Sequence, residues 1–289
     1  MAFAIFADSS CNLPRQWQED CRIQVIPFTY EQEGKLILCP DDPDEFDGKT
    51  YYDYLRNGGK VSTSLLSVGQ FVDALSPTLA QGLDALVLVL SSGISGTYGS
   101  ACQAAKLLEE EHPGRRVLVV DSLGAGLGVG KLAVSCAQYR RQGLTLQQTY
   151  EAILRDRDVL CQFFTVDDLN FLRRTGRVSG VTAVVGSMLQ IKPILRGNEE
   201  GHIVTLSKIR GRKKALGELA ELYRRRVVSP ETQTVFISHG DCLEDALTLA
   251  GMVRHIARPK ELVICLHEPL TGAHVGPGML ALFFYGDGR

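Results

Sequence analysis

Residues 85–111, "ALVLVLSSGISGTYGSACQAAKLLEEE", decide the fold of this chain. The uninterrupted apolar run from Ala85 to Leu90 is typical of a strand that is buried on both faces, as the strands of parallel sheets are. It ends in hydroxyl side chains and glycines, and a helix-like pattern follows at once. A buried strand, a polar break and a helix together form the repeating unit of an α/β protein.

The same unit recurs at 3–14, 117–143 and 234–256, and in each unit polar residues directly follow the strand. Such residues either cap the next helix or line a ligand crevice, because open α/β sheets bind ligands at the carboxyl ends of their strands. We expect a crevice, since all four units share the feature. The polar pairs are Asp8-Ser9, Ser91-Ser92, Asp121-Ser122 and Ser238-His239.

The chain is predicted to form two α/β domains, 1–160 and 161–289. The N-terminal domain is expected to contain a mainly parallel sheet, because its strands alternate with helices. The C-terminal domain is expected to contain a mixed sheet. Its segment 191–206, "IKPILRGNEEGHIVTL", is typical of two strands joined by a hairpin loop at 197–201.

Composition excludes several classes of protein. The chain has 289 residues, of which 45% are hydrophobic and 22% charged, and its net charge of -2 provides no field to attract nucleic acid. The N-terminus lacks the pattern of a signal peptide, and no apolar stretch approaches the length of a membrane span. The eight cysteines are scattered, with no C-x-x-C pair, so we expect reduced thiols and a cytoplasmic protein.

Familiar cofactor and catalytic motifs do not match. Segment 122–131, "SLGAGLGVGK", has Ala125 where a phosphate-binding P-loop needs Gly, and Leu132 follows it where the loop needs Ser or Thr. Thr97 replaces the final Gly of a nucleophile elbow in "GISGT". Four histidines lack metal-ligand spacing and are interpreted as ordinary surface or core residues: His202, His239, His255 and His267. We therefore expect no metal and no cofactor.

Two hydroxyl-rich loops are the better candidates for a ligand site. One contains Thr63 and Ser64, the other contains Ser95 and Gly96, and each precedes a helix-like pattern. Free backbone N–H groups, hydroxyl donors and the positive ends of helix dipoles suit an anion. The loops contain few basic residues, which favours a carboxylate held by hydrogen bonds over a triphosphate. His274, in the glycine-rich segment 272–278, is interpreted as a loop residue that contacts an anion or orients a hydroxyl group.

At this point the chain resembles the DegV family, bacterial fatty-acid-binding proteins that act as carrier subunits of a fatty acid kinase. The resemblance covers nearly the whole length. Its motifs are, in order, "DSSCNLP", "STSLLSVGQF", "LSSGISGTYGSA", "VVDSLGAGLGVG", "FTVDDLNFLRRTGRVSG", "SMLQIKPIL" and "GAHVGPGMLALFFYG". The fold implied is two α/β domains with the lipid between and within them.

The resemblance also implies roles for particular residues. Thr63 and Ser95 would bind the carboxylate of a long-chain fatty acid, with His274 close by, and Arg173 would lie on the surface that docks the kinase catalytic subunit. Ser64 and Gly96, which are neighbours in the same loops, are also expected to belong to the carboxylate site. The chain departs from the family pattern at Leu65-Leu66, usually Gln-Pro, and at Thr175, usually Gly, which puts the pocket and the docking loop in question.

These features predict a carrier without catalytic residues. The C-terminal domain would supply most of the acyl-chain tunnel, with candidate walls at 163–172, 181–191 and 279–285. Basic clusters, such as 208–214, suggest at most a transient contact with a membrane surface. Two alternatives stay open: an enzyme that acts on acyl or phosphoryl groups through Ser95 or His274, and a scaffold with a vestigial pocket.

Overall fold

The computed structural model describes residues 3–178 and 190–289. Its N-terminal half contains a parallel sheet of four strands in the order β2-β1-β6-β7. This arrangement confirms the parallel sheet that the repeating units predict. The strands are β1 (Phe3–Asp8), β2 (Ile23–Ile26), β6 (Asp84–Val89) and β7 (Val117–Asp121).

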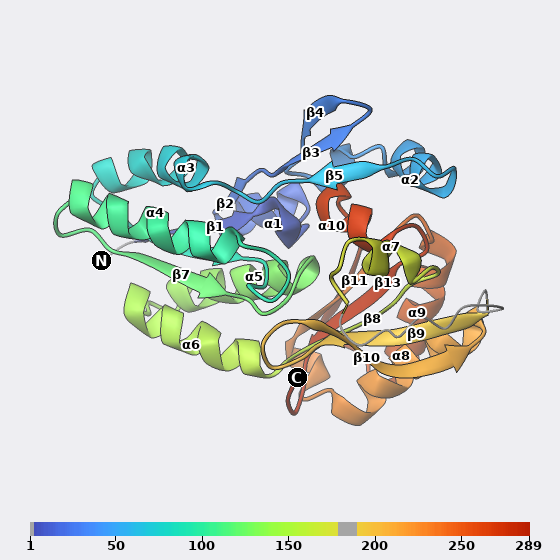
Figure 1. Ribbon diagram of the computed structural model, residues 1–289. Helices are drawn as coiled ribbons and strands as arrows, with labels where there is room; N and C mark the ends of the chain where they lie inside the picture. The colour runs from blue at the N-terminus through green and yellow to red at the C-terminus, as the bar shows by residue number, and fades with distance from the viewer. Residues whose placement is uncertain (1–2, 179–189) are drawn as a thin grey trace.

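Helices cover both faces of this sheet. Figure 1 shows α3 (Val68–Ala80) and α4 (Thr97–Glu111) on one side, and α5 (Leu127–Arg141) and α6 (Leu146–Asp158) on the other. The short helix α1 (Arg15–Cys21) packs beside α5. With both faces covered, every residue of β1 and β6 is buried, which explains their uninterrupted apolar sequences.

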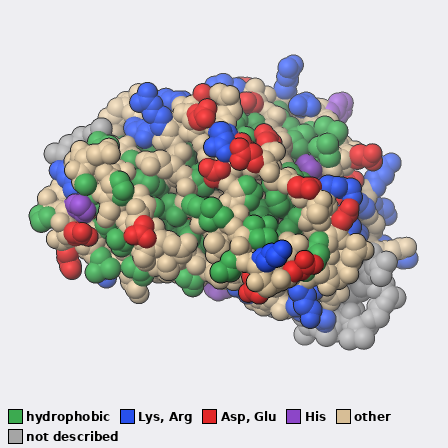
Figure 2. Space-filling model, turned by 90° about the horizontal axis from the view of Figure 1, so that it is seen from above, with side chains coloured by type: hydrophobic (Ala, Val, Ile, Leu, Met, Phe, Trp, Pro, Cys, Tyr) green, Lys and Arg blue, Asp and Glu red, His purple; other side chains and the backbone are tan. Residues whose placement is uncertain are grey.

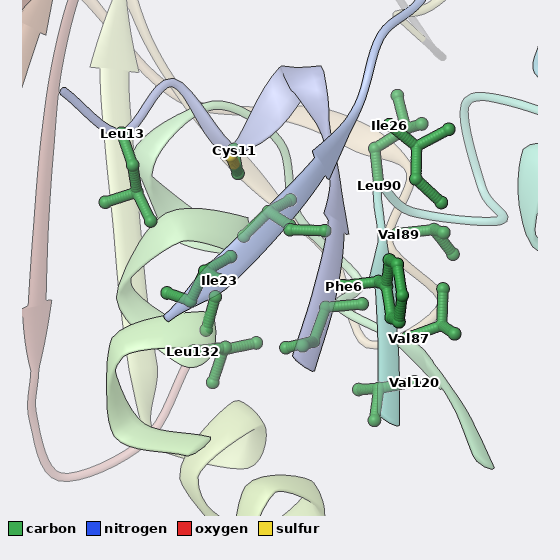
Figure 3. Packing of buried hydrophobic residues seen from close by; sticks show 14 of the residues in the cluster. Phe6, Cys11, Leu13, Ile23, Ile26, Val87, Val89, Leu90, Val120 and Leu132 are labelled. Atoms are coloured by element: carbon green, nitrogen blue, oxygen red, sulfur yellow. The ribbon is translucent and has the colours of Figure 1, made fainter. Parts of the chain in front are cut away.

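The core of this half packs tightly around β1 and α5. Phe6, Val87, Val120 and Leu132 are buried there, on neighbouring strands and on the helix beneath them (Figure 3). Gly130 lies in α5, and a Cβ atom there would be 2.4 Å from the carbonyl oxygen of Cys11. Glycine at this position of segment 122–131 therefore permits close packing. This structural role agrees with the absence of a nucleotide-binding motif in the segment.

A small antiparallel sheet of three strands, in the order β4-β3-β5, lies beside this core (Figure 1). It comprises β3 (Thr29–Gln32), β4 (Lys35–Leu38) and β5 (Val61–Thr63), with helix α2 (Gly48–Arg56) between β4 and β5 in sequence. Two 3-10 turns, η1 (Ser9–Cys11) and η2 (Pro43–Glu45), complete the segments that lead into α1 and α2. The sheet matters for function because it carries Thr63.

The C-terminal half contains a mixed sheet of six strands in the order β10-β9-β8-β13-β11-β12. Strands β11 and β12 are parallel, and the other neighbours are antiparallel. The predicted hairpin is formed by β9 and β10. The strands are β8 (Leu160–Thr165), β9 (Ile191–Gly197), β10 (Ile203–Arg210), β11 (Thr234–His239), β12 (Glu261–Leu266) and β13 (Leu280–Tyr285).

Helices α8 (Arg212–Arg226) and α9 (Leu243–Ile256) pack together against this sheet, with the 3-10 turn η3 (Pro230–Thr232) between them in sequence. Two short helices, α7 (Asn170–Arg174) and α10 (Pro269–Val275), contact each other. Helix α10 also contacts α2, β3 and β5 of the N-terminal half. Figure 1 shows it between the two halves, which places its side chains where a shared site can form.

The α/β fold class with one parallel and one mixed sheet is thus confirmed. The boundary near residue 160 coincides with the passage from α6 to β8, but one hydrophobic core includes both Phe6 and Phe283. The division into domains at that point therefore stays a prediction. Within the described ranges, no helix combines the length and apolar character needed to cross a membrane. All eight cysteines are free, as predicted.

Candidate functional site

A cavity of about 270 Å³ lies where the two halves meet. This volume is close to the lower end of the range of small-molecule sites, roughly 300–1,000 Å³. Most of its wall is apolar and comes from both halves, as in Phe28, Leu90, Ile94, Phe163, Phe164, Leu172, Met279, Ala281 and Phe283. The polar wall residues are Thr63, Ser64, Ser95, Gln162, Arg177, His267, Thr271 and His274.

The cavity lies at the carboxyl ends of β6 and β7, but the polar pairs that the sequence singles out at the strand ends do not line it. Asp8 accepts hydrogen bonds from the backbone N–H groups of Ser10 and Leu90, and Asp121 accepts from those of Ser92 and Leu123. For these residues the expected crevice is wrong, because they hold their own loops in shape. The wall is formed slightly further along, at 94–96 and 123–125.

Thr63 and His274 meet in the cavity wall, 2.9 Å apart between Oγ1 and Nε2. Thr63 is the last residue of β5 and lies opposite the buried Tyr30 of β3. His274 belongs to the last turn of α10, so the expectation that it lies in a loop is wrong. The helix forms because Glu268 caps its first turn and Pro269 occupies the first helical position.

Helix α10 is fixed at both ends. Two tyrosines of α2 hold its start, since Tyr51 donates to the carbonyl of Pro269 and Tyr52 to that of His267. The helix ends at Gly276, whose φ of 75° is in the left-handed region. A Cβ atom there would be 2.5 Å from the ring of Phe171 in α7, so glycine is required. The position of His274 therefore depends on α2, α7 and β5.

His274 is electrically neutral at pH 7. Burial, with the positive charge of Arg177 adding to it, lowers the pKa of His274 to about 4. Its Nδ1 atom has no hydrogen-bond partner among residues 3–178 and 190–289. A tautomer in which Nε2–H donates to Thr63 leaves the Thr63 hydroxyl proton free to donate to a ligand. The part of the cavity wall around Thr63 can therefore bind an anion through a hydroxyl donor.

Ser95 and Gly96 form the entry to α4 on the same cavity wall. Ser95 Oγ lies 2.9 Å from Thr97 Oγ1 and accepts a hydrogen bond from the Thr97 backbone N–H. Gly96 is the N-cap residue and has no side chain to occupy the helix end, so the nearby Ser95 hydroxyl takes the N–H of Thr97 instead. Leu65 lies beside it, 3.2 Å from the position that a Gly96 Cβ would take.

The two departures from the family pattern fall in different surroundings. Leu65 lines the cavity and is half exposed, whereas Leu66 is fully buried in the core. Thr175 ends α7, and its hydroxyl group donates to the carbonyl of Phe171. Leu65 thus changes the cavity wall, and Thr175 closes the last turn of α7.

The structure places Arg173 apart from the other candidate residues. It lies in the last turn of α7, exposed to solvent, and does not belong to the cavity wall. The neighbouring Arg174 stacks over the ring of Phe171. Arg177, three residues further, does line the cavity. Thr63, Ser64, Ser95, Gly96 and His274 are brought together, and Arg173 faces outward from the adjacent helix.

Four polar wall residues are not predicted from the sequence: Gln162, Arg177, His267 and Thr271. His267 Nδ1 lies 3.2 Å from the hydroxyl of Ser238, and its Nε2 lies 2.7 Å from that of Thr271. Thr271 in turn donates to the carboxyl group of Glu268. Burial, with a smaller contribution from His239, lowers the pKa of His267 to about 3, while burial raises that of Glu268 to about 7.

A sequence signal for part of this set existed. Residues 271 and 274 are three apart, a spacing that places side chains on one face of a helix. The glycines of this segment favour a loop, which hides the helical spacing. Gln162 carries no such signal, because its importance depends on the pairing of β8 with β13.

Two of the three predicted tunnel segments contribute to the wall. Phe163, Phe164 and Leu172 come from 163–172, and Met279 and Phe283 from 279–285. The third segment, 181–191, lies largely outside the described residues. Within the described ranges, no group of three His, Cys, Asp or Glu side chains is arranged to hold a metal ion.

The fold and the cavity define a class of α/β protein that has a parallel sheet, a mixed sheet and a mostly apolar cavity lined by both halves of the chain. The model of the family "Uncharacterised protein, DegV family" matches residues 2–287. A DegV domain-containing protein of Clostridium perfringens is 38% identical over 285 residues, covering 99% of this chain and 98% of its own. The chain belongs to the DegV family.

Solved structures of the family superpose closely on this chain. A DegV family protein from Thermus thermophilus, described by its fatty acid binding, has a TM-score of 0.88 at 26% identity, covering 99% of this chain and 100% of its own. DegV of Bacillus subtilis, described as a fatty acid binding protein, has a TM-score of 0.83 at 27% identity and covers 98% of both chains.

Proposed function

We propose that the chain binds a long-chain fatty acid in the cavity and presents its carboxylate to the catalytic subunit of a fatty acid kinase, which forms the acyl phosphate. The observation that carries this proposal is the contact between Thr63 and His274 in the wall of a mostly apolar cavity. The fatty acid binding of structural relatives supports it. Free cysteines agree with action in the cytoplasm.

The apolar wall supplies the affinity. Burying an acyl chain is worth about 0.8 kcal/mol per methylene, so ~14 methylenes contribute about 11 kcal/mol before ordering costs. Aromatic residues from both halves, such as Phe28 and Phe164, line the space for the acyl chain. A ligand of this kind is retained tightly without any ionic contact.

The carboxylate is held by hydrogen bonds from Thr63 and Ser95, with Ser64, Gly96 and His274 as neighbours. A neutral His274 fits this role, because it orients the Thr63 hydroxyl without forming an ion pair that would hinder release. Ser95 contacts Thr97 rather than an imidazole in the described structure, so we do not propose it as a nucleophile.

Arg173 is proposed to contact the kinase. It is exposed on α7, and α7 packs against α10, which carries His274. A partner that contacts Arg173 is thus close to the cavity end where the carboxylate would lie. The kinase would supply ATP and metal, and this chain supplies a positioned acid.

Mass spectrometry of an organic extract of the purified protein tests the binding. We expect a stoichiometric long-chain fatty acid, and Thr63→Ala or Ser95→Ala is expected to weaken binding by about 1–3 kcal/mol each. No bound acid, even after incubation with mixed fatty acids, would overturn the proposal. Unchanged affinity in both variants would overturn the assignment of the carboxylate end.

The docking role is tested with Arg173→Ala and its neighbour Arg174→Ala. The first variant is expected to bind fatty acid normally and to support less acyl phosphate formation by the kinase. Arg174→Ala is the matched control, because its guanidinium stacks on Phe171. Loss of lipid binding in Arg173→Ala, or equal effects of both variants on the kinase reaction, would contradict the proposed role.

A further inference from the structure

A hairpin near the carboxylate site has an exposed apolar face. It consists of β3 and β4, and Figure 1 shows it projecting beyond the parallel sheet of the N-terminal half. Leu36 and Leu38 of β4 are 75% and 60% exposed, more than any other large hydrophobic side chain of the described residues. Exposed apolar side chains on a strand favour association with another molecule.

Strand pairing separates the two faces of the small sheet. Ile37, Tyr30 and Thr63 are in register across β4, β3 and β5, and they share the face on which Tyr30 is buried. Successive side chains of a strand point to opposite faces, so Leu36 and Leu38 lie on the outer face. A substitution of either leucine therefore leaves the position of Thr63 unchanged.

Strand β4 is also an edge strand, since it pairs with β3 alone among the described residues. Its other side offers backbone N–H and C=O groups to a second chain. Edge strands are usually protected by proline, β-bulges or charged residues, but β4 has a regular register, no proline and one charged residue, Lys35. The tight turn at Glu33-Gly34, with φ of 53° and 75°, holds the hairpin in one conformation.

The hairpin and Arg173 flank the carboxylate site. Helix α10, which carries His274, contacts β3 and β5 and also α7, which carries Arg173 (Figure 1). Strand β4 lies two strands away from Thr63, about 10 Å at the usual spacing of strands. A partner that contacts both Arg173 and the hairpin therefore spans the site without covering the inner face of the small sheet.

The size of the hairpin favours a transient partner over a second copy of this chain. A stable dimer buries about 800 Å² and roughly 20–30 residues on each subunit. Strand β4 has four residues, Lys35–Leu38, and the turn before it has two. A contact of this size suits an enzyme that binds and dissociates in every reaction cycle, as a kinase acting on a carried carboxylate does.

We propose that the outer face and the free edge of the β3–β4 hairpin bind the catalytic subunit of the fatty acid kinase. The inference rests on the proposed function and adds a second contact to that of Arg173. The chemistry of the hairpin defines the partner surface: apolar side chains contact Leu36 and Leu38, and an extended segment forms main-chain hydrogen bonds along β4.

The test titrates the kinase catalytic subunit with the double variant Leu36→Lys/Leu38→Lys. We expect its affinity for the kinase to fall at least tenfold, because two apolar contacts are lost. Its bound fatty acid should stay stoichiometric. The carrier concentration that gives half-maximal acyl phosphate formation should rise accordingly, while the maximal rate stays within about twofold. Leu36→Ser/Leu38→Ser should also weaken the complex, which separates lost apolar contact from added charge.

The double variant Leu107→Lys/Leu243→Lys is the matched control. These leucines are 51% and 52% exposed and lie on α4 and α9. Helix α4 packs against α3, β6 and β7, and α9 packs against α8, β11 and β12, so neither belongs to the small sheet. This variant adds the same charge and is expected to bind the kinase as the wild type does.

The outcomes separate the two proposals. If the wild type supports acyl phosphate formation and the hairpin variants bind the kinase as tightly as the control does, the hairpin contact is overturned and the proposed function stands. A wild-type dimer that the hairpin variants convert to a monomer, seen by analytical ultracentrifugation of the protein alone, would also overturn it in favour of a second copy. Failure of the wild-type protein to support any acyl phosphate formation would overturn the presentation to a kinase itself.

Discussion

Two polar clusters lie one turn apart on α10, and they differ in how completely the protein satisfies them. At the end of the helix, His274 contacts Thr63 of the N-terminal half and has an unpartnered Nδ1 among the described residues. At its start, the hydrogen bonds run from Ser238 to His267, from His267 to Thr271 and from Thr271 to Glu268, all within the C-terminal half.

The difference separates a structural cluster from a binding cluster. The cluster at the start of α10, formed by Ser238, His267, Glu268 and Thr271, is called the closed cluster here. Its Glu268 accepts from the backbone N–H groups of Leu270 and Thr271, so this cluster caps the helix and holds it in place. The open cluster, Thr63 and His274, leaves the hydroxyl proton of Thr63 free to donate to a ligand when His274 Nε2–H donates to Thr63, and Thr63 lines the cavity. A polar group that the protein itself satisfies stabilises the fold, and one that it leaves incomplete is available to a ligand.

Glu268→Ala is expected to have the largest effect. It removes the acceptor of three hydrogen bonds, so the free energy of unfolding should fall by about 3 kcal/mol. Urea denaturation measures the loss. His274→Gln, at the open end of the same helix, is expected to cost less than about 1 kcal/mol. Equal losses in the two variants would remove the distinction between the clusters.

Thr271→Val removes a hydroxyl group of the closed cluster. Valine keeps the shape of threonine but leaves His267 and Glu268 each without one partner, so stability should fall by about 1–2 kcal/mol. The affinity for an unsubstituted fatty acid should stay within about threefold of the wild type. If Thr271→Val weakens fatty acid binding as much as Thr63→Ala does, the closed cluster is part of the carboxylate site.

Acid titration tests the two histidines. Burial lowers the pKa of His274 to about 4 and, with His239 nearby, that of His267 to about 3, so the unfolded chain takes up protons first as the pH falls below 6.5. Each histidine therefore removes stability on acidification, His274 down to about pH 4 and His267 down to about pH 3. Asp8 and Glu268, whose pKa values burial raises, act in the opposite sense.

The readout is accordingly the difference between variant and wild type. His274→Gln should flatten the decline in the free energy of unfolding between pH 6.5 and 4, measured by urea denaturation at several pH values. Parallel curves for the two proteins over that range would show that His274 is not held neutral by its surroundings.

Ser64→Ala is expected to have the smallest effect. Ser64 lines the cavity but is exposed, so water satisfies its hydroxyl in either state and the affinity for fatty acid should fall by about twofold or less. Ser62→Ala, a neighbour that does not line the cavity, is the control and should bind as the wild type does. A loss as large as that of Thr63→Ala would extend the carboxylate site to Ser64.

Much of the fold followed from local sequence patterns. The buried strands β1 and β6 and the hairpin of β9 and β10 were predicted because burial on both faces and turn-forming glycines leave direct signals. The low net charge of the sequence agrees with the surface, since Figure 2 shows basic and acidic side chains interspersed on the face seen from above. The resemblance to the DegV family predicts that Thr63, Ser95 and His274 form one site, and all three line the same cavity.

The remainder depended on tertiary packing. Helix α10 was interpreted as a loop because its glycines suggest a turn, but Glu268 and the tyrosines of α2 supply the contacts that make it helical. His267 was interpreted as an ordinary residue, since its partners lie on β11 and on α10. Gln162 was missed because its surroundings come from β13 and from the segment after β7.

The central claim is that the open cluster, and not the closed one, binds the carboxylate. A crystal structure of the protein with a saturated long-chain fatty acid tests it most directly. We expect the carboxylate oxygens within hydrogen-bond distance of Thr63 and Ser95, and the acyl chain running past His267 and Gln162. A carboxylate bound to Thr271 or Gln162, with the acyl chain directed toward His274, would contradict the account.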